Sequence, residues 1–413
     1  MVLHAGGDGC VFRSLPPVTL FWFHIPAFIS LIIWSVLIFA RGAFWRADQR
    51  LPSSAMPDEC HSDSGQERAP DIAVVIPARN EAETIGRTVS SLLAQEYSGA
   101  VHIIVVDDES SDGTGENVQR IANNSDRVTI IDGMPLNSGW TGKLWAVHQG
   151  LQHIDRVIPT ARYVLLTDAD IDHDCHSVQR LVCQAEQGRY DLVSLMVLLN
   201  CRYFWERLLI PAFVFFFQKL FPFAWVNDPK CETAAAAGGC MLVRRSALEN
   251  IGGVETIRNR LIDDCALAEA LKKKGPIWLG LTESVVSSRE YGSLDEIWRM
   301  VSRSAFEQLD HSSLRLLGTV FGMVIIYLVP PISCAAGGVF SDPVLFITGF
   351  LAWGGMVWAY RPTLTLYKRS WLWGLLLPVI GGLYTLMTFT SAYQYWRGRG
   401  GGWKSRYYSP AGS

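Results

Sequence analysis

The sequence predicts an α/β domain with a mainly parallel sheet, placed between transmembrane helices at both ends of the chain. From Asp71 onward, short and wholly apolar runs alternate with helical patterns, which is typical of buried parallel strands covered by helices. Long uncharged stretches lie near both ends. Charged residues make up 18% of the 413 residues and the mean hydropathy is +0.17, so the chain is too apolar for an ordinary soluble enzyme.

The first uncharged stretch runs from Val18 to Ala40 and predicts a spanning helix. At about 1.5 Å per residue it is long enough to cross a hydrocarbon core of roughly 30 Å. It exceeds the apolar region of a cleaved signal peptide, and no A-x-A-like site follows it. We therefore expect residues 1–50 to form an N-terminal transmembrane anchor. Arg41, Arg46 and Arg50 place the end of this helix in the cytoplasm.

A second hydrophobic region, residues 314–396, is expected to cross the membrane again. Three uncharged stretches in it are long enough to span: Leu316–Ala336, Pro343–Tyr360 and Trp371–Ala392. Three crossings would put the basic tail, residues 397–413, outside, whereas its arginines and lysines favour the cytoplasm. A break at Pro330-Pro331 would make the first stretch re-entrant or surface-lying and leave an even number of crossings. The sequence leaves this count open.

The polar middle of the chain is expected to be cytosolic and the protein to be a multi-pass protein of the inner, cytoplasmic membrane. Residues 51–70 are proline-containing and polar, as in a linker, and residues 71–313 form the predicted domain. Within it, the aromatic segment Leu208–Trp225 favours an interfacial segment lying against the bilayer, the alternative being a buried core helix. The nine cysteines lack C-x-x-C spacing and predict reduced thiols. The net charge of −3 provides no overall positive field that would attract a nucleic acid polymer, so none is expected as a partner.

Acidic residues follow two of the predicted strands. The predicted strands are Ile72–Ile76, His102–Val106, Val128–Ile131 and Tyr163–Leu166, and the acidic residues follow the second and the fourth of them. Ligands of such sheets bind beyond the carboxyl ends of the strands. Asp168 and Asp170 follow one strand and can hold a hard divalent cation through oxygen ligands, the alternative being a solvated turn. Asp107 and Asp108 follow another and can accept hydrogen bonds from a nucleotide, the alternative being an Asx-turn.

Six segments resemble, in order and spacing, the motifs of family-two glycosyltransferases with the GT-A fold. They are VVIPARNEAETI (74–85), VVDDESSDGT (105–114), GK (142–143), TDAD (167–170), GGCMLVRRSAL (238–248) and DDCALA (263–268). The resemblance covers about Asp71 to Leu309. Three later segments are more narrowly similar to the hopene-associated membrane glycosyltransferases of bacterial hopanoid gene clusters: RMVSRSAFEQL (299–309), LLGTVFGMVIIYLVPP (316–331) and WRGRGGGWKSRYY (396–408).

The resemblance implies a donor site for a UDP-sugar. The residues that it assigns to the uracil and ribose are Pro77, Ala78, Arg79, Asn80, Glu81, Asp107 and Asp108. It makes Asp168 and Asp170 the metal motif, with Asp170 as the direct ligand of Mg²⁺ or Mn²⁺. Lys143 matches a position near the donor, where an ammonium offsets phosphate charge; the alternative is a surface lysine at a helix start.

The resemblance also implies an acceptor side. Gly238 and Gly239 match a loop beside the sugar and the acceptor, and glycines allow a close backbone approach to a ligand; the alternative is a tight turn before a strand. Asp263-Asp264 falls where the family has a Glu-Asp pair, so Asp264 is the expected base that takes the proton of the acceptor hydroxyl. Asp263 is one methylene shorter than the usual Glu and is expected to orient or contact the acceptor.

Arg299 and Arg303 are four residues apart and project from one face of a predicted helix, towards a donor diphosphate. The alternative is a cationic stripe that faces the membrane. In processive relatives the corresponding motif ends in Arg-Trp, whereas Ser304 follows Arg303 here. This departure favours transfer of a single sugar over extension of a polymer.

We therefore expect a membrane-bound, inverting, metal-dependent glycosyltransferase. It would move one sugar from a nucleotide-diphosphate donor, a UDP-sugar, to a lipid hydroxyl of a hopanoid or related lipid. The expected partners are the donor, the lipid acceptor and the bilayer. A nucleotidyltransferase is an alternative, although Pro77–Glu81 is not the Gly-rich, Arg/Lys-bearing loop that such an enzyme needs. A non-catalytic scaffold of a lipid-synthesis assembly is another.

Overall fold

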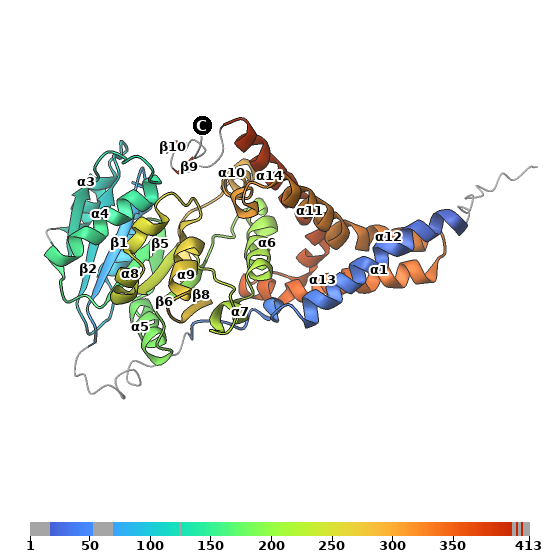
Figure 1. The fold of residues 1–413 in the computed structure, drawn as a ribbon, viewed down its shortest axis with the longest axis horizontal. Helices are drawn as coiled ribbons and strands as arrows, with labels where there is room; N and C mark the ends of the chain where they lie inside the picture. The colour runs from blue at the N-terminus through green and yellow to red at the C-terminus, as the bar shows by residue number, and fades with distance from the viewer. Residues whose placement is uncertain (1–16, 53–68, 124, 399–401, 404–405, 408–413) are drawn as a thin grey trace, which may run out of the picture.

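The computed structural model describes residues 17–52, 69–123, 125–398, 402–403 and 406–407. An α/β domain forms one end of the molecule, and a helical arm projects from the other (Figure 1). Most of the predicted linker, 51–70, and most of the basic tail, 397–413, lie outside the described residues.

The α/β domain is built on one eight-stranded sheet in the order β3-β2-β1-β4-β7-β6-β8-β5. The strands are β1 (Ile72–Ala78), β2 (Val101–Asp107), β3 (Val128–Asp132), β4 (Tyr163–Thr167), β5 (Ile171–His173), β6 (Leu192–Leu198), β7 (Cys240–Arg244) and β8 (Ile277–Ser287). Parallel pairing joins β3, β2, β1 and β4, and also β6 and β8. Only β7 and β5 run against their neighbours, so the predicted mainly parallel sheet is confirmed.

Both faces of the sheet are covered, which explains why its strands are continuous apolar runs. Every residue of β1 is buried, and alternate residues belong to two different cores. Val74 packs in the core that includes α2 (Ile85–Leu93) and α5 (Ser177–Gln187), whereas Val75 packs in the core that includes α4 (Gly142–Val157). The covering layers are completed by α3 (Thr114–Ala122), α8 (Arg245–Asn250) and α9 (Asp263–Lys272).

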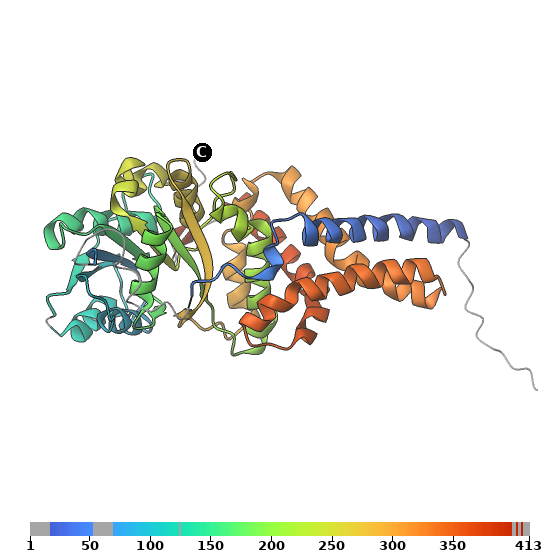
Figure 2. The same ribbon diagram turned by 90° about the horizontal axis from the view of Figure 1, so that it is seen from below.

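The arm consists of three helices that lie side by side: α1 (Pro17–Phe39), α12 (Val329–Val339) and α13 (Pro343–Leu366) (Figures 1 and 2). At its tip the imidazole of His24 lies 3.0 Å from the carboxylate of Asp342. At its base the rings of Trp45 and Trp358 are 4.2 Å apart. Two further helices, α11 (Ser313–Met323) and α14 (Leu377–Trp396), run obliquely between the arm and the domain (Figure 1).

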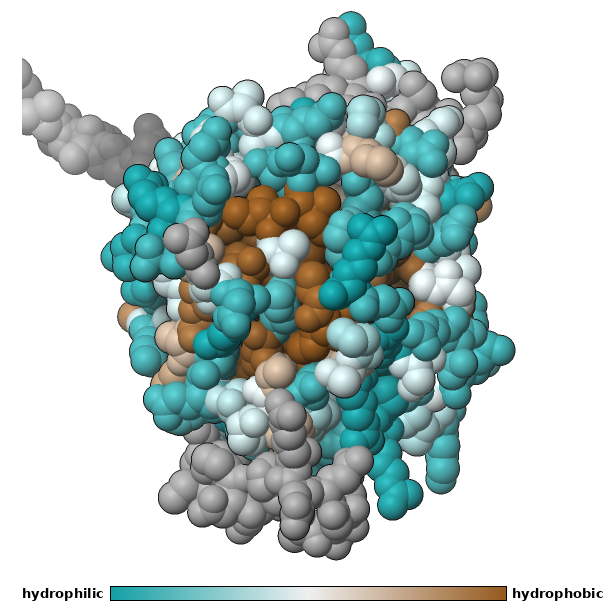
Figure 3. All heavy atoms as spheres, turned by 90° about the vertical axis from the view of Figure 1, so that its left-hand side faces the viewer, coloured by the Kyte–Doolittle hydropathy of each residue, from teal (hydrophilic) through white to brown (hydrophobic). Residues whose placement is uncertain are grey.

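Among the residues that the structure describes, four helical segments are long and apolar enough to cross a membrane: Trp22–Phe39, Ser313–Val339, Pro343–Leu366 and Trp371–Trp396. They coincide with the four uncharged stretches of the sequence. Large exposed apolar side chains gather on them, for example Phe39, Phe321, Phe350 and Phe389. The opposite end of the molecule is mostly hydrophilic around one apolar area (Figure 3).

Pro330 and Pro331 bend the segment Ser313–Val339 instead of ending it. A π-helical turn, Val324–Leu328, precedes them, and both prolines lie in the first turn of α12, where a missing N–H costs least. The indole N–H of Trp34 donates to the Ile326 carbonyl at 2.8 Å and satisfies one acceptor of the irregular turn. The chain therefore changes direction between α11 and α12 (Figure 1).

The aromatic segment Leu208–Trp225 forms α6 (Phe204–Leu220) and α7 (Phe223–Asn227), between the sheet and the oblique helices. Most of α6 is buried against α13, α14 and α10 (Leu294–Ser302). Its first turn is fixed by the buried carboxylate of Glu206, which accepts backbone N–H bonds from Tyr203 at 2.9 Å and Tyr291 at 2.6 Å. The buried-helix alternative therefore describes α6 better than a helix lying on the bilayer.

The cysteines follow the expectation with one correction. Of the seven cysteines in the described ranges, six are free thiols: Cys175, Cys201, Cys231, Cys240, Cys265 and Cys334. Cys183, on α5, is disulfide-bonded, so the expectation of reduced thiols is wrong there.

Candidate active site

A cavity of about 1430 Å³ opens at the carboxyl edge of the sheet and extends to α6, α10, α11 and α14. Most residues that the sequence nominated line it: Pro77, Glu81, Lys143, Asp168, Asp170, Gly238, Gly239, Asp263, Asp264, Arg299 and Arg303. They come from segments up to 226 residues apart in the chain (Pro77 to Arg303). The fold therefore gathers dispersed polar residues around one space.

Five nominated residues do not line this cavity: Ala78, Arg79, Asn80, Asp107 and Asp108. Instead, they lie at the ends of β1 and β2 and in the loops that follow these strands, and contacts between these loops hold them together. The guanidinium of Arg79 donates to the Asp108 carbonyl and lies 3.6 Å from its carboxylate. Asn80 has φ 51°, and its amide oxygen accepts from the Ser111 N–H at 2.9 Å. Asp108 is wholly buried, so of the acidic pair only Asp107 is partly exposed.

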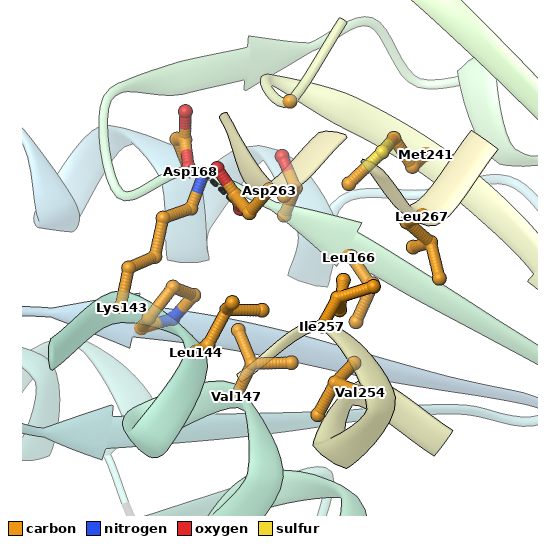
Figure 4. A pocket seen from close by; sticks show the side chains of 13 residues that line it. Lys143, Leu144, Val147, Leu166, Asp168, Met241, Val254, Ile257, Asp263 and Leu267 are labelled. Atoms are coloured by element: carbon orange, nitrogen blue, oxygen red, sulfur yellow. Dashed lines mark ion pairs between the residues drawn. The ribbon is translucent and has the colours of Figure 1, made fainter. Parts of the chain in front are cut away.

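Lys143, in the first turn of α4, bridges two carboxylates. Its Nζ lies 3.0 Å from Oδ1 of Asp168 and 3.2 Å from Oδ2 of Asp263 (Figure 4). Burial alone would lower the pKa of Lys143, but the charges of Asp168 and Asp263 outweigh it and raise the pKa above its usual value. The ammonium is therefore charged at neutral pH. It is an interior group, and the alternative of a surface lysine is wrong.

The two acidic residues that begin α9 have different surroundings. Asp263 faces Lys143, whereas Oδ2 of Asp264 accepts the Gly238 N–H at 2.8 Å and its Oδ1 accepts the Cys265 N–H at 2.7 Å. Burial, and then the charge of Asp263, raise the pKa of Asp264 to about 6. A carboxylate with such a pKa is ionised at neutral pH and is basic enough to accept a proton.

Gly238 and Gly239 lie where a side chain would be crowded by its neighbours. A Cβ on Gly238 would lie 3.2 Å from Nζ of Lys143 and 3.3 Å from Oδ2 of Asp264. A Cβ on Gly239 would lie 3.2 Å from a methyl group of Val197. The Thr167 hydroxyl donates to the Gly239 carbonyl at 2.8 Å and ties this loop to the end of β4. Close packing, beside Asp264 and Lys143 for Gly238 and beside Val197 for Gly239, rather than an unusual φ, explains both glycines.

Asp170 is held by Arg289, a residue that the sequence analysis missed. Nε of Arg289 lies 2.9 Å from Oδ2 of Asp170, and its Nη2 lies 2.7 Å from Oε1 of Glu81. The Ser287 hydroxyl donates to the same Asp170 oxygen at 3.2 Å. Arg289 lies in SSREYGS after β8, outside every recognised motif. Only the three-dimensional pairing with two distant carboxylates reveals it.

Asp168 and Asp170 fit the requirements of a hard divalent cation. Both follow β4 and line the cavity, and each already faces a cationic side chain. Two carboxylates suit Mg²⁺ or Mn²⁺ when a diphosphate supplies further oxygen ligands. Within the described residues, the one group of three possible ligands close enough to share an ion is Glu96, Cys175 and His176, none of which lines the cavity.

Arg299 and Arg303 both line the cavity, as the diphosphate hypothesis requires. Arg299 is exposed on α10 and pairs with Asp295, 2.8 Å away, whereas Arg303 lies one residue beyond the end of the helix.

The fold and the site define a class of protein. Residues 73–252 match the model of the family described as "Glycosyl transferase family 2". The matched residues run from β1 past α8, within the GT-A-like α/β domain, and it is this part of the chain that resembles the family.

Curated relatives share part of this domain. The undecaprenyl-phosphate 4-deoxy-4-formamido-L-arabinose transferase of Proteus mirabilis is 34% identical over 134 residues, 31% of this chain and 37% of that protein. The 4,4'-diaponeurosporenoate glycosyltransferase of Staphylococcus aureus is 26% identical over 202 residues, 48% of this chain and 50% of that protein. The chain thus spans half or less of the length of these relatives.

A solved structure is also similar. The mannosyltransferase PcManGT from Pyrobaculum calidifontis, in complex with GDP-Man and Mn²⁺, has a TM-score of 0.48 and 18% identity, over 89% of this chain and 98% of that one.

Proposed function

We propose that this protein transfers a single sugar, with inversion, from a nucleotide-diphosphate donor to a hydroxyl group of a membrane lipid. The observation that carries the proposal is one continuous cavity. It joins the carboxylates at the edge of the sheet to apolar side chains on α6 and to helices of the hydrophobic region. A soluble acceptor would not need such a connection.

The polar end of the cavity suits the donor. A UDP-sugar brings a diphosphate, whose charge is matched by Lys143, Arg299 and Arg303. Asp168 and Asp170 would hold Mg²⁺ or Mn²⁺, which neutralises the departing diphosphate when bound. The loops of Pro77–Glu81 and Asp107-Asp108 are braced behind this end and are proposed to cradle the nucleoside, with Asp107 as the more accessible carboxylate.

Asp264 is the proposed base. An inverting transfer needs one group to accept the proton of the attacking hydroxyl, and Asp264 combines a cavity position with a pKa of about 6. Asp263 is committed to the ion pair with Lys143 and therefore suits a supporting role. Gly238 leaves room for an acceptor beside Asp264 because a side chain there would crowd both groups.

The apolar end of the cavity suits a lipid. Phe213, Phe216 and Phe217 line it from α6, with Met323 from α11 and Tyr384 from α14. The names of the two curated relatives also mention lipids, undecaprenyl phosphate and diaponeurosporenoate. A hopanoid is the proposed acceptor class because segments 299–309, 316–331 and 396–408 resemble hopene-associated enzymes. Ser304 in place of an aromatic residue supports transfer of one sugar.

The arrangement of helices supports a specific membrane topology. We propose that α1, α12 and α13 cross the inner membrane, with the His24–Asp342 pair at the outer surface and Arg41 at the cytosolic one. His24 to Arg41 spans about 25 Å of helix axis, close to a hydrocarbon core. Since α11 and α14 both run obliquely beside the domain (Figure 1), they would lie at the cytosolic surface.

This topology resolves the conflict in the sequence. Two crossings after the cytosolic domain, by α12 and α13, return the chain to the side from which it left. Arg397, at the end of α14, then lies on the cytosolic side, as the positive-inside rule requires. The domain boundaries 1–50, 51–70, 71–313, 314–396 and 397–413 stay a proposal, with α6 packed on the helices of the fourth segment.

The experiment that tests the function uses membranes containing the full chain. They are incubated with a panel of nucleotide sugars and extracted hopanoids, and lipid products are followed by mass spectrometry. One glycosylated lipid that requires both the protein and a UDP-sugar supports the proposal. Binding of UDP with Mn²⁺ but no product with any acceptor would favour the scaffold alternative, and release of diphosphate from a sugar 1-phosphate with a nucleoside triphosphate would favour a nucleotidyltransferase.

A further inference from the structure

The guanidinium of Arg289 lies directly against the carboxylate of Asp170, the proposed metal ligand. Its guanidinium bridges Asp170 and Glu81, with contacts of 2.9 and 2.7 Å. Asp170 is 8% exposed, and Ser287 occupies the same oxygen as Arg289. A divalent cation that used this oxygen would approach the guanidinium closely, and two like charges at such a distance repel each other strongly in a partly buried site.

We propose that Arg289 is a displaceable cation that competes with the divalent metal for Asp170 in the donor-free protein and turns to the donor diphosphate when metal and donor enter together. The proposal rests on the proposed function, since it assumes a nucleotide-diphosphate donor. It adds a role for a residue outside the recognised motifs. Its consequence is that metal binds weakly alone and tightly with the donor.

The charges explain why the empty site needs Arg289. Asp170 and Glu81 are both carboxylates with little exposure, their side chains being 12% and 11% exposed. Without a cation between them they would repel each other and lose solvation. Arg289 supplies that cation when no metal is present. A bound metal would neutralise the charge of Asp170 in place of Arg289. Asp170 would then no longer need the positive charge of the guanidinium.

The backbone around Arg289 is held, so a change of partner involves the side chain alone. The Ser288 N–H donates to the Asp170 carbonyl at 2.8 Å, and the Tyr291 N–H donates to Glu206 at 2.6 Å. The side chain of Arg289 is 35% exposed and lines the cavity. It can therefore rotate from the carboxylates into the space that the donor would fill.

The destination follows from guanidinium chemistry. The planar fork of an arginine that bonds a carboxylate pair also bonds phosphate oxygens. A diphosphate in the cavity would keep some negative charge after one divalent cation binds it. Arg289 lies beside Asp170, the proposed metal ligand, so its guanidinium can reach phosphate oxygens bound there. Metal and donor would then stabilise each other's binding, and such coupling is reciprocal by thermodynamic necessity.

The test measures Mn²⁺ binding to the full-length protein in detergent, by the electron paramagnetic resonance signal of free Mn²⁺, without and with UDP. The variants are Arg289→Gln, which removes the competing charge, and Arg289→Lys, which keeps the charge but loses the fork. Arg202→Gln is the matched control, because Arg202 is an exposed arginine that pairs with Glu290, beside Arg289. Thermal melting of each variant checks folding.

Arg289→Gln is expected to bind Mn²⁺ alone about tenfold more tightly than the wild type, because one competing charge is gone. It is expected to bind UDP with Mn²⁺ more weakly, so the coupling between the two ligands shrinks. Arg289→Lys should lie between, and Arg202→Gln should match the wild type. A merely structural arginine would weaken both kinds of binding when replaced.

Unchanged or weaker binding of Mn²⁺ alone to both Arg289 variants would overturn the proposal. So would an undiminished coupling between UDP and Mn²⁺ in Arg289→Gln. Neither result affects the proposed function, which fails separately if the wild type binds no UDP at any Mn²⁺ concentration.

Discussion

Lys143, in the first turn of α4, and Asp263, the first residue of α9, form an ion pair with 3.2 Å between Nζ and Oδ2. The same ammonium lies 3.0 Å from Asp168. One cation therefore joins the proposed metal motif to the proposed catalytic pair. Asp263 is therefore held in an ion pair, whereas the contacts described above give Asp264 two backbone hydrogen bonds.

Replacing Lys143 by Gln should impair donor binding and chemistry together. The change leaves Asp168 and Asp263 facing each other without a cation, and it removes a partner of the diphosphate. A hydrogen bond to a charged group contributes about 1.5–3 kcal/mol, so kcat/KM for the donor should fall roughly 10- to 100-fold. Steady-state kinetics measure this. The control is Lys273→Gln, which replaces an exposed lysine that pairs with Glu269. Unchanged kcat/KM would contradict the role.

The pH profile should follow Asp264. Its pKa is raised to about 6, and a base acts only when deprotonated, so kcat/KM should be level above about pH 7 and fall about tenfold per unit below 6. The charge of Lys143 lowers the pKa of Asp264, so Lys143→Gln should move this limb to higher pH. A limb near pH 4, or one that does not move in the variant, would contradict the assignment.

Asp170→Asn should remove the metal dependence of donor binding. The change takes a charged oxygen ligand from a hard-cation site, so transfer should fall by about 10² or more. UDP binding should become independent of Mn²⁺, which calorimetry with and without the metal detects. Asp172→Asn is the control, two residues along in β5 and outside the cavity lining. Metal-dependent binding that survives in Asp170→Asn would rule out the ligand assignment.

The proposed topology can be tested by labelling. Ser341→Cys, in the turn between α12 and α13, should react with a membrane-impermeant maleimide in intact spheroplasts. Ser312→Cys, before α11, should react only after permeabilisation, and a fluorescent protein fused to the C-terminus should fluoresce. The unsubstituted protein measures labelling of the native cysteines. Protection of Ser341→Cys in intact spheroplasts would contradict a three-crossing arrangement.

Much of the fold was predictable because its signals are local. The continuous apolar runs of β1, β2 and β4 and the acidic residues that follow them are adjacent in the sequence. The ion pairs of Arg289 with Asp170 and Glu81 were not predictable, because these three residues come from distant segments of the chain. The burial of α6 and the oblique course of α14 also depend on tertiary packing, which hydropathy alone does not contain.

The most direct test of the central claim compares Asp264→Asn with Asp263→Asn in the lipid-transfer assay. Asn keeps the shape of the side chain but cannot accept the proton, and general-base catalysis contributes about 10² to 10⁴ in rate. Asp264→Asn should therefore lose at least that factor in kcat, with donor affinity nearly unchanged. Asp263→Asn should lose less. Near-full turnover by Asp264→Asn would contradict the account: if Asp263→Asn is then inactive, Asp263 is the base, and if both remain active the base lies elsewhere.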